Sequence, residues 1–195
     1  MKHITLKMEQ NACLWCSMMS WVWSLMNQGG CTQMTISILE GHVPEGYQFN
    51  PCSPLQEENP CYNHSPKSGD KVHCLVGVMS ANAICGMSAG LKGKLRAIRD
   101  KASSLGIPQF LVVTMVDTAC PAVKKNLIDI YKSKAIKKKM ETYSNELGIP
   151  MSCILPVKNY HEETKTDNEA DVLVLEAVTQ IVHAANDYIW TLQQK

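Results

Sequence analysis

The sequence predicts an α/β protein built on a small parallel sheet, and the prediction rests on apolar runs separated by an amphipathic segment. Two continuous apolar runs lie at residues 72–79 and 109–113, and residues 88–105 between them carry apolar side chains at steps of three and four. Continuous apolar strands are typical of parallel sheets that helices cover on both faces. Residues 151–155 supply a third run. We therefore expect three core strands, joined by right-handed crossovers and flanked by helices.

Composition and charge exclude several classes of function. A chain of 195 residues is long enough for one domain with a core and does not require a second. The 19 basic and 18 acidic residues give a net charge of +1, which offers no electrostatic basis for binding nucleic acid or an anionic membrane. No apolar run reaches the roughly 20 residues that a membrane-spanning helix needs.

The nine cysteines indicate a reducing compartment. Cys74, Cys85 and Cys153 lie inside or next to predicted elements of the core, where cysteine behaves as a small buried hydrophobe. A disulfide framework would place cysteines in loops instead, so we expect a cytoplasmic protein. The pair Cys13 and Cys16 has zinc-like spacing, but no second close pair accompanies it, and we expect no metal site. Other candidate ligands in a loop are Cys52, Cys61 and His64.

Residues 1–34 differ in character from the rest of the chain and hold three of its four tryptophans. Residues 12–26 are apolar and about as long as a signal-peptide core, yet Glu9 lies where such a signal must be basic. No small-x-small cleavage site follows Met26. We interpret residues 1–34 as a divergent, poorly specified N-terminal segment and residues 35–195 as the α/β domain.

The elements around the first crossover follow from periodicity and from helix-stop signals. A short helix is expected within residues 35–49, and the proline-rich residues 50–70 predict a surface loop. The helix of residues 88–105 ends where Gly106 provides a C′ residue and Pro108 prevents continuation. Its basic side chains lie off the apolar face and are expected to be solvated: Lys92, Lys94, Arg96, Arg99 and Lys101.

Two further helices are expected between the second and third strands. Pro121 suits a first-turn position, and residues 123–131 carry a helical apolar stripe. Residues 133–147 form a second, lysine-rich helix. Because the total charge is near zero, we interpret these lysines as solvated and not as a nucleic-acid or phosphate site.

The same Leu-Gly-Ile-Pro quartet occurs at residues 105–108 and 147–150, where a helix ends and a strand begins. We interpret the two quartets as a shared solution to one junction and not as a duplicated domain. After the third strand, Asp167 or Asn168 is expected to cap a long helix over residues 169–192.

Polar side chains follow the second and third strands. Thr114 and Asp117 end the second strand, and Lys158 and Asn159 follow the third. Ligands of open parallel sheets bind beyond the carboxyl ends of the strands. A carboxylate there can accept two hydrogen bonds from the N1 and N2 edge of guanine, and Lys158 with Asn159 could close the other side of the pocket. Alternatively, Asp117 has a structural role as a cap of the next helix or in a turn with the following threonine.

Several junctions resemble the interferon-induced protein 44 and 44-like family. The matching segments are residues 47–51, 72–79, 106–108, 114–117, 120–121, 147–150, 155–160 and 184–188. The resemblance covers residues 35–195 and leaves out residues 1–34. It implies the C-terminal part of a Ras-type, P-loop-NTPase-like domain. In that domain Thr114 and Asp117 belong to the guanine-reading motif, and Lys158 and Asn159 to the last base-contacting loop. Met115 departs from the motif, whose usual lysine packs its stem over the base.

The phosphate-reading half of such a domain is missing from these residues. No G-x-x-x-x-G-K-[ST] loop and no Asp-x-x-Gly motif occur in the sequence. Phosphoryl transfer depends on the positioning and charge stabilisation that those parts supply. We therefore expect a vestigial site without catalytic residues or a required cofactor, a pseudo-GTPase that binds GTP or GDP only at low affinity.

The resemblance implies an interferon-induced protein of the immune and antiviral response that acts through contacts with protein partners. A guanine-nucleotide-binding, GTPase-like enzyme of weakened affinity, whose functional form is a longer relative, is the alternative. A third interpretation is that residues 1–34 arise from splicing or gene prediction.

In the Ras-type order a strand would lie beside residues 72–79. Its loss leaves an open edge that invites pairing with residues 3–8 or with another chain, including a second copy.

Overall fold

The computed structural model describes residues 31–48, 55–161 and 165–194. The chain divides into two compact units, Met1–Lys71 and Val72–Lys195, and each is described by itself. Most of the predicted N-terminal segment lies outside the described residues, so the predicted domain boundary after residue 34 stays a prediction.

The described part of the first unit consists of a helix and a loop that returns to its end. Helix α2 spans Cys31–Glu40. It begins earlier than the helix expected within residues 35–49, and it ends directly before Gly41, which takes a positive φ of 86°. A Cβ on Gly41 would lie 2.9 Å from the Asp70 carbonyl oxygen, so only glycine fits. Asn63 holds the same junction by donating to the Gly41 carbonyl and to the Asp70 carboxylate, both at 3.2 Å. A short 3-10 helix, η1, spans Ser68–Asp70.

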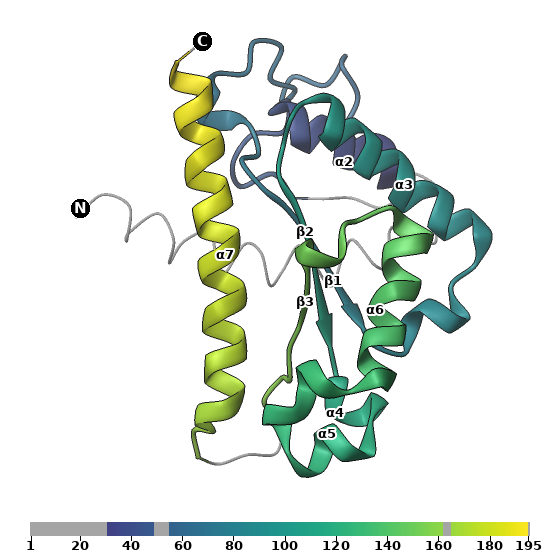
Figure 1. Cartoon of the computed structure of the whole chain (residues 1–195). Coiled ribbons are helices and arrows are strands. Elements are labelled where there is room, and N and C mark those ends of the chain that lie inside the picture. The colour runs from purple at the N-terminus through teal and green to yellow at the C-terminus, as the bar shows by residue number, and fades with distance from the viewer. Residues whose placement is uncertain (1–30, 49–54, 162–164, 195) are drawn as a thin grey trace. The chain divides into compact units, whose positions relative to one another are not determined.

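The second unit is organised around a three-stranded sheet, as predicted (Figure 1). Strands β1 (Leu75–Ser80), β2 (Gln109–Thr114) and β3 (Ile154–Pro156) are parallel and lie in the order β1-β2-β3. Leu75 is opposite Gln109, and Leu111 is opposite Ile154. The central strand β2 buries Leu111 and Val113 almost completely.

Two strands differ from their predicted bounds because of the register of β2. Residues 72–74 are not part of β1, since the ladder starts where Leu75 N donates to Pro108 O, directly before β2 begins. Met151–Cys153 form the 3-10 turn η4, closed by Cys153 N donating to Pro150 O, so β3 starts only at Ile154.

Three long helices flank the sheet. Figure 1 shows α3 (Ala89–Ser104) and α6 (Lys134–Leu147) on one side and α7 (Asn168–Gln193) on the other. All three agree with the predicted helices to within two residues at each end. Each has a side-chain cap at its N-terminus, from Ser88, Ser133 and Asp167 respectively. None of the described helices has the length and apolar character that crossing a bilayer requires.

The prediction of a single helix over residues 121–131 is wrong. Two short helices replace it, α5 (Pro121–Lys125) and η3 (Leu127–Lys132), and a one-turn helix, α4 (Val116–Ala119), precedes them. Asn126 breaks the continuity because its backbone is extended, with φ −147°. Val123, Leu127 and Ile130 of the apolar stripe are buried, as expected, but Tyr131 at its end is 62% exposed. A further 3-10 turn, η2 (Ala83–Gly86), connects β1 to α3.

The basic face of α3 is not simply solvated, contrary to the prediction. Arg96 Nε donates to the Glu146 carbonyl and Arg99 Nη1 to the Gly148 carbonyl, both at 2.6 Å. Lys92 Nζ lies 3.1 Å from the Glu146 carboxylate. These cations neutralise the partial negative charge at the C-terminal end of α6 and hold the two helices together. In contrast, Lys134, Lys137 and Lys138 of α6 are exposed, as predicted, whereas Lys139 is half-buried and donates to Asn82 Oδ1 at 2.8 Å.

Candidate functional site at the carboxyl edge of the sheet

The parallel arrangement brings the two predicted polar clusters to one edge. Because β2 and β3 are neighbours, residues 114–117 and residues 157–159 leave the sheet at the same end. Val157 N donates to the Val113 carbonyl at 2.8 Å and extends this alignment beyond β3. Helices α4 and α5 lie at this end of the sheet (Figure 1).

Thr114 is buried at the end of β2 and is almost inaccessible to solvent. Its side chain is 8% exposed, and its hydroxyl donates to the Met79 carbonyl of β1 at 3.4 Å. In this structure Thr114 therefore links β2 to β1, and the role implied for it in guanine recognition stays a prediction.

Asp117 does not cap the helix that begins at Pro121, but it does lie in a turn with Thr118, because both residues belong to the four-residue helix α4. It lies in the first turn of α4, and Cys120 occupies the N-cap position of α5. The turn is closed instead by the Thr118 hydroxyl, which donates to the Met115 carbonyl at 2.8 Å. Asp117 is half-buried, and its carboxylate makes no hydrogen bond or ion pair within the described ranges. It is free to accept hydrogen bonds from a ligand.

Met115 is the one non-glycine residue with a positive φ among the residues described, at φ 57° and ψ 39°. A left-handed conformation costs an L-residue about 1–2 kcal/mol. Such strain is found preferentially at functional sites. The left-handed conformation of Met115 turns the chain sharply from β2 into α4. As a result, Val116 is buried and Met115 is 45% exposed. No sequence signal marks this conformation, because methionine gives no sign of a left-handed residue.

Lys158 and Asn159 follow β3 and differ in their surroundings. Lys158 Nζ is 3.4 Å from the Asp167 carboxylate at the start of α7, whereas Asn159 is exposed. The Tyr160 hydroxyl donates to Asp171 Oδ1 at 2.8 Å and accepts from the Asp167 backbone amide at 2.6 Å. The loop after β3 is therefore held to the N-terminal turn of α7. Sequence reasoning missed this tether because it joins residues across a loop with no periodic pattern.

Cys120 lies between α4 and α5. Its thiol is 3.3 Å from the Ser133 hydroxyl. That hydrogen bond, together with the backbone amides of Val123 and Ala122, lowers the pKa of Cys120, while burial acts in the opposite direction. No group of three His, Cys, Asp or Glu side chains able to hold a metal ion occurs in the part of the chain that the structure describes. Cys13, Cys16 and Cys52 lie outside that part.

The fold and this edge define a small parallel α/β protein with a candidate site for a planar ligand beyond β2 and β3. The chain is 34% identical over 163 residues to interferon-induced protein 44 of Mus musculus, across 84% of this chain and 39% of the relative. It is 31% identical to interferon-induced protein 44 of Homo sapiens, across 83% and 37% of the two chains. With the human interferon-induced protein 44-like it shares 29% identity, across 83% of this chain and 36% of the relative.

The chain is therefore a relative of the interferon-induced protein 44 and 44-like family, as the resemblance indicated. It spans 36% to 39% of the length of these curated relatives. No family model matches the sequence, and no solved structure matches the fold. The relation to Ras-type domains stays a prediction.

Proposed function

We propose that this chain is an interferon-induced, cytoplasmic protein of the immune and antiviral response. It carries a degenerate guanine-nucleotide-binding-like domain and acts through protein contacts without catalysis. One observation carries the proposal: the polar residues of a base-reading edge, Asp117 and Lys158 with Asn159, follow adjacent strands, while this sequence contains no phosphate-binding loop. The names of the relatives support interferon induction.

The physical argument is that base recognition and phosphate recognition are separable. A carboxylate at Asp117 can accept from the N1 and N2 groups of guanine, but two such hydrogen bonds contribute only a few kcal/mol after desolvation, about 1.5–3 kcal/mol each with a charged acceptor. Millimolar affinity already requires about −4 kcal/mol. Lys158 must also leave Asp167 before its stem can pack against a base. Weak or absent nucleotide binding follows.

The second candidate is a guanine-nucleotide-binding, GTPase-like protein of low affinity. The unpartnered Asp117 carboxylate favours it, because a half-buried carboxylate beyond a parallel strand is well placed to bind a ligand. The two candidates differ in affinity and in turnover, so one set of measurements separates them.

Isothermal titration with GTP, GDP and ADP in the presence of Mg²⁺ tests the proposal. We expect no binding of micromolar affinity and no release of phosphate from GTP. Micromolar binding of GDP but not of ADP, lost in Asp117→Ala and retained in the control Asp129→Ala, would establish the second candidate. Interferon induction is tested separately, by quantifying the protein in cells of its source organism before and after treatment. An unchanged amount contradicts that part of the proposal.

A further inference from the structure

Exposed apolar side chains in the second unit are concentrated around α7. Among the described residues, ten large hydrophobic side chains are exposed, and five of them are on this helix: Val172, Val174, Leu175, Val178 and Trp190. Ile128 and Tyr131 belong to η3, which contacts α7, and Tyr160 donates its hydroxyl hydrogen bond to Asp171 of α7. Isolated exposed hydrophobic residues are ordinary, whereas a group of eight around one element indicates an interaction surface.

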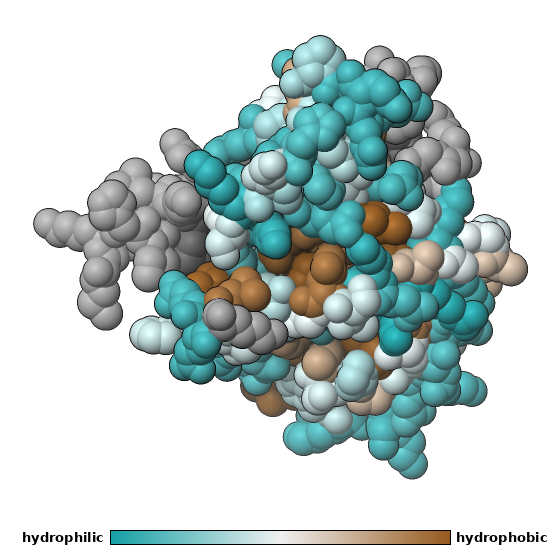
Figure 2. Space-filling view, turned by 90° about the horizontal axis from the view of Figure 1, so that it is seen from above, coloured by the Kyte–Doolittle hydropathy of each residue, from teal (hydrophilic) through white to brown (hydrophobic). Residues whose placement is uncertain are grey.

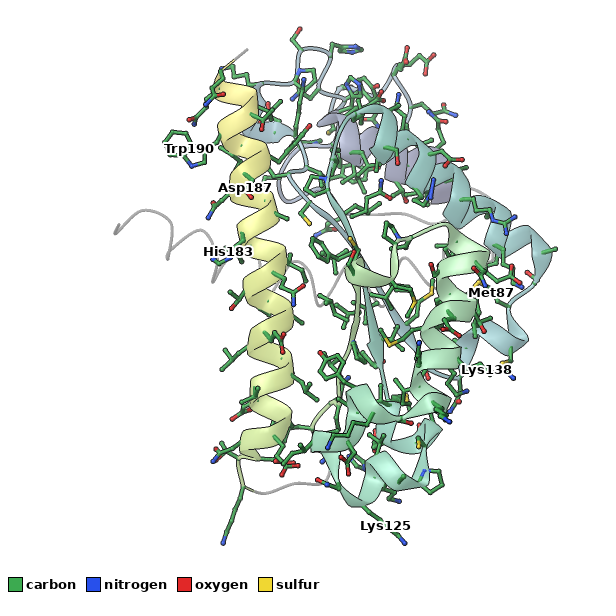
Figure 3. The ribbon with its side chains drawn as sticks, in the orientation of Figure 1. Met87, Lys125, Lys138, His183, Asp187 and Trp190 are labelled. Atoms are coloured by element: carbon green, nitrogen blue, oxygen red, sulfur yellow. The ribbon has the colours of Figure 1, made fainter. Side chains whose placement is uncertain are left out.

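Helix α7 carries apolar side chains on two of its faces, and only one of these faces is buried in the described part of the fold. Leu173 and Ala177 are buried toward the sheet. Val172 and Leu175 are 61% and 64% exposed, and Trp190 is 65% exposed. Figure 3 shows Trp190, His183 and Asp187 on the side of α7 that is turned away from the sheet. Brown hydrophobic residues also reach the surface among hydrophilic ones in the view of Figure 2.

The charge on α7 is of one sign. Its 26 residues include no lysine or arginine, and its acidic residues are Glu169, Asp171, Glu176 and Asp187. Helix α3, by comparison, carries five basic residues and one acidic residue. The Glu176 carboxylate faces Tyr131 of η3, because it contributes, after burial, to raising the pKa of the Tyr131 hydroxyl. An apolar surface with acidic flanks favours a partner that is apolar and basic.

We propose that the outer face of α7, together with Ile128 and Tyr131, binds a basic amphipathic helix of a partner protein. The apolar stripe of the partner would pack against Val172 and Leu175, and its lysine or arginine side chains would face Glu169 and Glu176. Helix-on-helix recognition of this kind uses anchors at steps of three and four residues. A second copy of α7 fits poorly because it would bring acidic residues against acidic residues, and an anionic membrane would be repelled by them.

The probe is a fluorescein-labelled, 18-residue amphipathic peptide of leucine and lysine, and its matched control replaces every lysine by glutamate. Fluorescence anisotropy with the full chain is expected to show at least tenfold tighter binding of the lysine peptide. Leu175→Gln, which changes an exposed side chain, is expected to weaken that binding at least fivefold while the circular dichroism spectrum stays unchanged. Unaltered affinity of Leu175→Gln would overturn the proposal.

Charge reversal distinguishes this surface from general electrostatic attraction. Glu169→Lys with Glu176→Lys is expected to reverse the preference, so that the glutamate peptide binds more tightly. Glu57→Lys with Glu58→Lys changes the net charge by the same amount at exposed positions in the first unit and is expected to leave the preference as it is. An equal response of both double variants would overturn the proposal. So would self-association, measured by sedimentation velocity, that Leu175→Gln abolishes.

Discussion

A single buried hydroxyl closes the end of the first strand. Tyr143 of α6 is fully buried, and its hydroxyl donates to the Ser80 carbonyl at 2.7 Å. Ser80 is the last residue of β1, and its carbonyl points away from β2, where the sheet offers no partner. Burial raises the pKa of Tyr143 to about 12. The hydroxyl is therefore held in its neutral, donating form.

Tyr143→Phe is expected to lower the free energy of unfolding by about 1–2 kcal/mol, because it leaves a carbonyl acceptor unsatisfied. The folded pKa of about 12 lies above the ordinary value of 10, so the contribution of Tyr143 is complete below pH 10 and is lost as the pH rises toward 12. Urea denaturation between pH 8 and pH 12 should show that the free energy of unfolding falls less steeply with rising pH in Tyr143→Phe than in the unaltered chain. Tyr131→Phe, at an exposed position, is the control, and an effect as large as that of Tyr143→Phe would contradict the assignment.

At the scale of single residues the sequence located the candidate edge but not its internal contacts. It could be predicted that residues 114–117 and 157–159 leave the sheet at the same end, because parallel strands end at one side of a sheet. The ion pair of Lys158 with Asp167 could not be predicted, since it depends on how the intervening loop folds back. The left-handed Met115 was equally beyond prediction, because tertiary packing imposes that conformation against local preference.

At the scale of elements, the two Leu-Gly-Ile-Pro junctions are alike in backbone and differ in surroundings. Gly106 and Gly148 have φ of 72° and 71°, which confirms that both helices end through a left-handed glycine. A Cβ on Gly106 would meet only Tyr188 Cε2 at 3.8 Å, whereas a Cβ on Gly148 would lie 2.5 Å from Arg99 Nη1. The quartet at residues 147–150 therefore contacts Arg99 of α3, whereas in the quartet at residues 105–108 the Leu105 carbonyl accepts a hydrogen bond from the Tyr188 hydroxyl of α7 at 3.0 Å.

Gly106→Ala is expected to cost about 1 kcal/mol of stability, the price of a left-handed alanine. Gly148→Ala should cost about 1–2 kcal/mol more, because it also displaces Arg99 from the Gly148 carbonyl. Denaturant unfolding of both variants measures the difference. In an Arg99→Ala background the two substitutions should lower the free energy of unfolding by equal amounts. If the difference between them persists there, Arg99 is not the cause of that difference.

Helices with clear periodicity and caps were predictable, and short elements were not. Helices α3, α6 and α7 each combine an apolar stripe with a serine or aspartate cap, so local and tertiary preferences agree. Between β2 and α6 the apolar stripe was right except for the exposed Tyr131, and the continuous helix was wrong. The extended Asn126 divides that stretch, and Val123, Leu127 and Ile130 are buried nevertheless.

At the scale of the whole molecule, β1 is an edge strand of the sheet, and no other strand of the described residues pairs with its outer side. Leu75 N and Ala81 N donate to carbonyls of Pro108 and Thr114, so the odd-numbered residues of β1 face β2. Val76 and Val78 alternate with them, and their backbone groups have no hydrogen-bond partner among the described residues. Residues 3–8, which the sequence offers as a cover for this edge, lie outside the described residues. The cover therefore stays a prediction.

Hydrogen exchange monitored by NMR tests whether the edge is covered. If residues 3–8 or another chain pair with β1, the amides of Val76 and Val78 should exchange as slowly as those of Gly77 and Met79, because all four would then be hydrogen-bonded. Leu6→Pro removes a ladder hydrogen bond and should accelerate Val76 and Val78 alone, whereas Leu6→Ala should not. Protection that instead rises with protein concentration would assign the cover to a second copy. Rapid exchange of Val76 and Val78 at every concentration in the unaltered chain would mean that the edge is bare.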